Sequence, residues 1–170
     1  MTAHALAAEA WITAVLGCAA IIDDVARRRV SNWIPLLAFV SGMFLQTIEK
    51  GWRGSVAGLA GTLVGASAFL VFYIMGGMGG GDIKLLAGFG AVLGSTHVLE
   101  AALWTGACGG LIALGTLGVS AVRRSLHRRQ APAIHLGPEH PGVVTSIPYA
   151  PAIALGVWLT LASQASGITA

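Results

Sequence analysis

Charge is what this chain of 170 residues has least of. Only 10% of its residues are Asp, Glu, Lys or Arg, whereas 55% are hydrophobic and the mean hydropathy is +0.78. Soluble domains carry about 25% charged residues, so the composition predicts an integral membrane protein. The net charge is only +3, and the basic residues stand in short clusters between apolar runs. That pattern is typical of membrane topology and not of nucleic-acid binding.

Cysteine is almost as scarce. Cys18 and Cys108 lie in separate apolar segments, which argues against a disulfide framework or a zinc site. We interpret both as small buried hydrophobic residues. Three histidines (His127, His135 and His140) stand in the one long polar stretch, but their spacing matches no pattern of metal ligands. The sequence therefore predicts no metal site and no cofactor.

The apolar runs predict an all-α fold. They indicate six helices, at about 5–23, 33–48, 54–76, 83–96, 97–122 and 149–166. A membrane span needs about 20 apolar residues, so the second run is short and the fourth is shorter still. A re-entrant segment is a second interpretation of the fourth run. We expect a polytopic membrane protein of about six transmembrane helices in a compact bundle, forming a single domain over residues 1–170.

The ends of the chain and its longest polar stretch fit the same interpretation. The first apolar run lacks the basic region and the cleavage site of a secretory signal, so we expect it to be retained as a span. The polar stretch at about 123–147 is rich in Pro, Gly, His and Arg and is expected to be a cytoplasmic loop. Small residues recur at four-residue spacing in the third run, at Ala57, Gly61 and Gly65, with Gly54 and Gly58 nearby, which favours tight helix packing.

The distribution of basic residues predicts the orientation in the membrane. If residues 24–32 face the cytoplasm and six spans alternate, only Lys50 and Arg53 lie on the opposite side, and the other eight of the ten Lys and Arg residues are cytoplasmic. Both termini are then outside. The same alternation places Asp23, Asp24 and Asp82 at the cytoplasmic ends of spans, so acidic side chains distant in sequence meet at one face.

Asp82 lies in "IMGGMGGGDIKLLAG", at residues 74–88. One interpretation makes it a helix N-cap that accepts a backbone hydrogen bond. An Asp within a membrane costs about 2.5–3.5 kcal/mol and usually has a function, which favours a second interpretation as a site residue. The glycines fit this one, since glycine tolerates a positive φ and lets another backbone come close, as an extended peptide in a cleft requires.

Asp23 and Asp24 close the first run, in "IIDDVARRRVSNWIP" at residues 21–35. They either pair with Arg27 or Arg28 as interface charges or contribute one carboxylate to the bundle interior. Neighbouring helix positions point about 100° apart, so only one of the two can face inward.

Two carboxylates at one face supply the parts of an aspartic protease. One carboxylate takes a proton from water and the other, protonated, polarises the scissile carbonyl. Alternatively, the same Asp residues line an ion or proton path in a small transporter or channel. Transporters of that kind usually contain two corresponding halves, and the Gly-rich break has no second copy. A purely structural scaffold would leave the buried acid unexplained.

At these residues the sequence resembles the type IV prepilin peptidases, which are intramembrane aspartyl proteases of the GxGD type. The family's first block, an Asp followed after five residues by Ile/Leu-Pro-Asn/Asp, corresponds to "DVARRRVSN". Its second block, GxGDxK, corresponds to "GGGDIK", and its third, Pro-Tyr followed by Ala-Ile and Gly, to "IPYAPAIALG". The matching residues of the site are Asp24, Asn32, Gly79, Gly81, Asp82, Lys84, Pro148 and Tyr149.

The register of the first block assigns the catalytic role to Asp24, because Val30 follows it by six residues, and leaves Asp23 as a dispensable neighbour. Ser31 stands where the family usually has proline, which is expected to loosen the turn. Longer family members also carry an N-terminal region with paired CxxC cysteines and methylate the processed pilin. This chain resembles the short forms of tight-adherence (Flp-type) pilus systems, so no methyltransferase activity is expected.

The resemblance implies an aspartic endopeptidase of the bacterial inner membrane. Asp24 and Asp82 would be catalytic, with Gly79, Gly81, Lys84, Asn32, Pro148 and Tyr149 supporting the active-site loops. Its substrate would be a prepilin or pseudopilin whose N-terminal leader precedes a hydrophobic helix, cut at the cytoplasmic membrane face. The expected partners are this peptide and the lipid bilayer.

Overall fold

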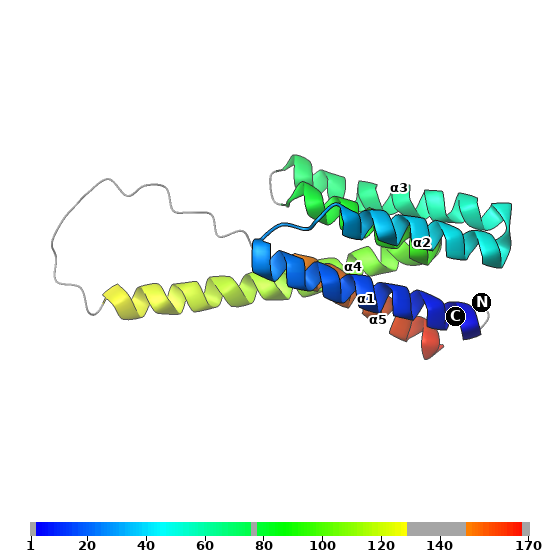
Figure 1. Ribbon diagram of the computed structural model, residues 1–170. Helices are drawn as coiled ribbons and strands as arrows, with labels where there is room; N and C mark the ends of the chain where they lie inside the picture. Colours follow the sequence, from blue (N-terminus) through cyan, green and yellow to red (C-terminus); the bar gives the residue numbers. More distant parts are fainter. Residues whose placement is uncertain (1–2, 76–77, 129–148, 168–170) are drawn as a thin grey trace.

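The computed structural model describes residues 3–75, 78–128 and 149–167 of the chain (Figure 1). These residues form α-helices joined by short segments and contain no strand. The elements in chain order are α1 (Ala3–Arg27), α2 (Trp33–Lys50), α3 (Trp52–Ile74), α4 (Gly80–Arg128) and α5 (Ala150–Ala165). The expected all-α class is confirmed.

Three helices within the described ranges are long and apolar enough to cross a membrane: Leu6–Arg27, Trp52–Ile74 and Gly80–Thr116. α5 is a shorter apolar helix. Large apolar side chains lie on the outside of the bundle, among them Trp11, Val15, Leu63, Val71 and Leu103. Such a surface suits lipid, whose tails are as apolar as leucine. The protein is therefore compatible with a helical membrane protein, and the number of six spans stays a prediction.

The two runs expected at 83–96 and 97–122 form the two arms of α4, which reverses at Gly94 with φ 74° and ψ 175°. A methyl group on Gly90 would lie 3.1 Å from the side chain of Val98, although residues eight apart in a straight helix are separated by about 12 Å. In Figure 1, α4 accordingly folds back on itself. The first arm, residues 80–93, reaches only about 21 Å at 1.5 Å per residue, against about 30 Å for the hydrocarbon core.

A side chain of α2 supports this reversal. The carbonyl groups at the end of the first arm have no partner within the helix, and Gln46 Nε2 donates to the Val92 oxygen at 2.8 Å. Lys50 Nζ in turn donates to Gln46 Oε1 at 3.1 Å. Gln46 is buried, at 2% exposure, so its side-chain amide takes the place of water as the hydrogen-bond partner of the Val92 carbonyl group.

The glycines of α3 lie in close helix contacts, as their spacing predicts, with Gly54 and Gly58 nearest to α2 and the next two nearest to α4. Gly54, Gly58, Gly61 and Gly65 are all buried. A methyl group on Gly61 would overlap the carbonyl oxygen of Gly90, and one on Gly65 would lie 2.8 Å from that of Leu86. This backbone-to-backbone approach fixes the first arm of α4 against α3.

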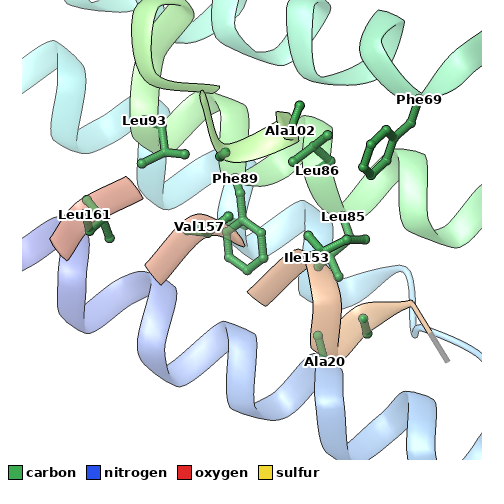
Figure 2. Packing of buried hydrophobic residues seen from close by; sticks show 13 residues of the cluster. Ala20, Phe69, Leu85, Leu86, Phe89, Leu93, Ala102, Ile153, Val157 and Leu161 are labelled. Atoms are coloured by element: carbon green, nitrogen blue, oxygen red, sulfur yellow. The ribbon is translucent and has the colours of Figure 1, made fainter. Parts of the chain in front are cut away.

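The core of the bundle lies between the first arm of α4 and α5. Figure 2 shows Phe89 and Leu85 of α4 beside Ile153 and Val157 of α5, and all four are fully buried. On the other side of α5, Trp158 Nε1 donates to the Thr13 oxygen of α1 at 3.2 Å. α5 thus links α1 to α4.

Two expectations need correction. The polar stretch 123–147 does not begin as a loop, because α4 continues through Arg128; basic residues suit the carboxyl end of a helix, where they offset its dipole. The rest of that stretch, with His135 and His140, lies outside the described residues.

Cys18 is exposed on α1 and only Cys108 is partly covered, so the expectation that both are buried is wrong.

The contact between α3 and α4 predicts that Gly61→Ala destabilises the protein by about 1–3 kcal/mol, the usual cost of overpacking. Gly115→Ala is the matched control, because a methyl group there meets nothing within 4 Å and alanine is the better helix former. Thermal unfolding in detergent micelles measures both. Equal midpoints for the two variants would contradict the close packing of α3 on α4.

Candidate active site

Asp24 lies in the last turn of α1 and is buried, at 7% exposure. Its Oδ2 accepts a hydrogen bond from the backbone N–H of Ala150, the first residue of α5, at 3.0 Å. The N-cap residue of α5, Tyr149, offers no side-chain cap of its own. A carboxylate from the far end of the sequence therefore caps α5, at the helix end where negative charge is favoured.

Asp82 lies in the first turn of α4 and is also buried, at 9% exposure. It is the third residue of the helix, so the N-cap position belongs to Gly79. The Asp82 carboxylate accepts a hydrogen bond from the Gly79 backbone, and the Asp82 N–H donates to the Gly79 oxygen at 3.1 Å. The bond from the Gly79 backbone to the Asp82 carboxylate is the one that the third helical residue makes to the N-cap residue in a capping box. Asp82 therefore caps α4 from a position inside the helix.

The start of α2 and the segment before it hold the ends of α1 and α4 together. Gly81 lies against Val30, whose nearest atom would be 3.6 Å from a methyl group on Gly81. Lys84 Nζ donates to Asn32 Oδ1 at 3.1 Å. Asp24 is close enough to Asp82 for its charge to act on that carboxyl group. The two acids, 58 positions apart in the sequence, thus lie at the same end of the bundle.

The other expected site residues, and Asp23 beside them, have different surroundings. Asn32 and Lys84 bond to each other as described, and the ring of Tyr149 would lie 3.3 Å from a methyl group on Gly109. Pro148 lies outside the described residues. Asp23 has partners different from those of Asp24: its Oδ2 accepts the Ser31 N–H at 2.7 Å and its Oδ1 pairs with Arg27 Nε at 3.4 Å.

Gly79 and Gly81 do not adopt the backbone conformation that would demand glycine. Within the described residues the glycines with positive φ are Gly51, Gly94 and Gly167. A methyl group on Gly79 would lie 3.4 Å from Asp82 Oδ2 and one on Gly81 3.6 Å from Val30, which are ordinary contacts. The idea that these glycines serve a positive φ is wrong. Any need for glycine here must come from something that approaches from outside.

Sequence reasoning missed the backbone N–H of Ala150 as part of the site. Every residue except proline carries such a group, so nothing in the sequence marks it. The Asp23–Ser31 bond was missed as well, although the Asp-Asp pair and the serine in a proline position were both visible. Among the described residues, no three His, Cys, Asp or Glu side chains gather as metal ligands would.

The arrangement is suited to acid–base chemistry. Two neighbouring carboxyl groups do not readily ionise together, because their charges repel. A pair that shares one proton can activate water with the ionised member and donate a hydrogen bond with the protonated one.

Comparison with known proteins identifies a family for this chain. The model of the type IV leader peptidase family matches residues 11–114, which include both Asp24 and Asp82. No curated protein and no solved structure matches the chain. The match favours a peptidase over the transporter alternative. Because it covers more than half of the sequence, the chain belongs to the type IV leader peptidase family.

Proposed function

We propose that this chain is an intramembrane aspartic endopeptidase that removes the N-terminal leader from type IV or Flp-type prepilins. The observation that carries the proposal is the placement of two buried carboxylates, Asp24 and Asp82, at the amino ends of α5 and α4, at the same end of the bundle. Both lie within the region matched by the family. No other described pair of acids has this placement on two helix ends.

The proposed reaction is a hydrolysis by water held between the two Asp side chains. The ionised carboxylate takes a proton from the water while the water oxygen bonds to the scissile carbonyl carbon. The protonated partner donates a hydrogen bond to the carbonyl oxygen. The C–N bond then breaks, and a proton from the pair passes to the leaving amine. Atoms balance with one water consumed for each peptide bond cut.

The cytoplasmic face of the inner membrane is the proposed place of this reaction. Arg27 lies in the last turn of α1 with Asp24, Arg28 and Arg29 follow that turn, and Lys84 follows Asp82 by two residues. The three arginines are exposed, and basic residues favour the cytoplasmic side of a membrane protein. The leader of the substrate would be cut there, with its hydrophobic helix in the bilayer.

Gly79 and Gly81 are proposed to let the substrate backbone approach Asp82. Neither glycine is needed for the fold's own contacts, because a methyl group at either position would meet its neighbours at ordinary distances. An extended peptide can come closer to a residue without a Cβ atom. Lys84 and Asn32 are proposed to hold the two segments in register through their hydrogen bond.

Replacing either catalytic Asp by Asn is expected to abolish leader removal. Asp24→Asn and Asp82→Asn each remove a group that must gain or lose a proton, a loss of about a hundredfold or more. Asp23→Asn is the matched control and should keep activity, because its amide oxygen can still accept the Ser31 N–H. Co-expression with a tight-adherence prepilin, with the leader followed by electrophoretic mobility, measures all three. Complete processing by the Asp82→Asn variant would refute the proposal.

The three consecutive glycines allow a second test. Gly79→Ala and Gly81→Ala are expected to lower leader removal about tenfold or more, equivalent to about 1.4 kcal/mol in the barrier, without changing the thermal midpoint. Gly80→Ala is the control, since its methyl group would lie 3.6 Å from the ring of Tyr73 in α3. If all three variants lost activity alike, the loss would stem from the start of α4 and not from the approach of a peptide.

A further inference from the structure

The segment between α1 and α2 carries a strained residue directly beside the site. Arg28 has a φ of 52°, the one positive value among the described non-glycine residues. This left-handed conformation is uncommon for residues with a side chain and persists only where neighbouring contacts impose it. The Arg28 N–H donates to the Asp24 backbone oxygen at 2.7 Å. The chain therefore turns sharply at the residue that follows the last turn of α1.

Asp23 holds the far side of this turn. Its side chain is 13% exposed, and its Oδ2 accepts the backbone N–H of Ser31 at 2.7 Å. The ion pair with Arg27 involves a largely exposed guanidinium, and exposed pairs contribute little. A short hydrogen bond to a carboxylate is among the stronger polar contacts. The Asp23–Ser31 bond is thus the main side-chain interaction that holds residues 28–32 against α1.

Residues 28–32 also contact the start of α4, the helix that carries Asp82. Val30 packs on the buried core and lies beside Gly81, and Asn32 bonds to Lys84. Gly81 is the neighbour of Asp82, just as Asp23 is the neighbour of Asp24. The hydrogen bond between Asp23 and Ser31 is therefore one of a series of contacts that connects the Asp24 end of α1 to the Asp82 end of α4.

We propose that Asp23 is a positioning residue whose bond to the Ser31 N–H sets the separation of Asp24 and Asp82. The inference rests on the proposed aspartic protease function. It also accounts for Ser31: a proline at this position has no N–H to donate, so serine is compatible with the bond and the family's usual proline is not. Ser31 was expected to loosen the turn, whereas here its amide helps to fasten it.

The test is a double-mutant cycle on the full-length enzyme in detergent, with a prepilin that the wild type processes. Asp23→Ala is expected to lower kcat about tenfold, with KM for the prepilin and the thermal midpoint unchanged. Asp23→Asn is expected to stay within about twofold of the wild type, because it keeps an acceptor. In a Ser31→Pro background, Asp23→Ala should have no further effect, since the donor is already gone.

Ser31→Ala provides the matched background, because it keeps the backbone N–H and removes only the hydroxyl, which also bonds to the Asp23 carboxylate. There Asp23→Ala should still lower kcat through the loss of the N–H bond, by a factor no larger than in the wild type. If Ser31→Pro does not fold, the contrast between Asp23→Ala and Asp23→Asn in the wild-type and Ser31→Ala backgrounds still decides the question. Wild-type kcat for Asp23→Ala, or a lower thermal midpoint that accompanies its lost activity, would overturn the proposal.

Asp82→Asn separates this inference from the function on which it rests. If Asp82→Asn abolishes leader removal while Asp23→Ala leaves kcat unchanged, the protease function stands and the positioning role is refuted. If Asp82→Asn processes the prepilin fully, the protease function itself is refuted, and the positioning role with it.

Discussion

The hydrogen bond between the Asp24 carboxylate and the Ala150 N–H is the contact on which the arrangement of the site depends. A buried carboxylate is unfavourable without polar partners, and the first N–H groups of a helix have none within the helix. Asp24 and α5 satisfy each other in this way. Asp82 does the same for α4 through Gly79. Both acids are thus accommodated in an apolar protein by the amino ends of helices.

Much of the fold could be predicted because lipid imposes simple rules on sequence. A backbone in hydrocarbon must satisfy its own hydrogen bonds, so long apolar runs become helices, and α1, α2, α3 and α5 lie close to the expected ranges. The packing of α3 was visible in the spacing of its glycines. Asp24 and Asp82 stood out because charge is rare in this chain and because their neighbours match known blocks.

The parts that were not predicted depend on contacts between distant residues. A break between the runs 83–96 and 97–122 was predicted, but its place at Gly94 and its support by Gln46 of α2 were not, since one glycine among 24 gives no local signal. The partner of Asp24 is a backbone amide, which every residue type but proline supplies. The motif glycines suggested a positive φ, but their backbone adopts ordinary conformations, because residues 80 and 81 already belong to α4.

The two carboxylates are held by unequal means. Asp82 stands on the first arm of α4, whose backbone is locked against α3 where Gly61 meets Gly90 and Gly65 meets Leu86. Asp24 stands at the end of α1, which is fixed near the site by hydrogen bonds to α5 and to the turn at Arg28. Close-packed backbones adjust little, so the separation of the acids is set mainly from the α1 side. A small change in the segment between α1 and α2 then reaches the pair directly, which gives Asp23 influence over the site without any contact to substrate.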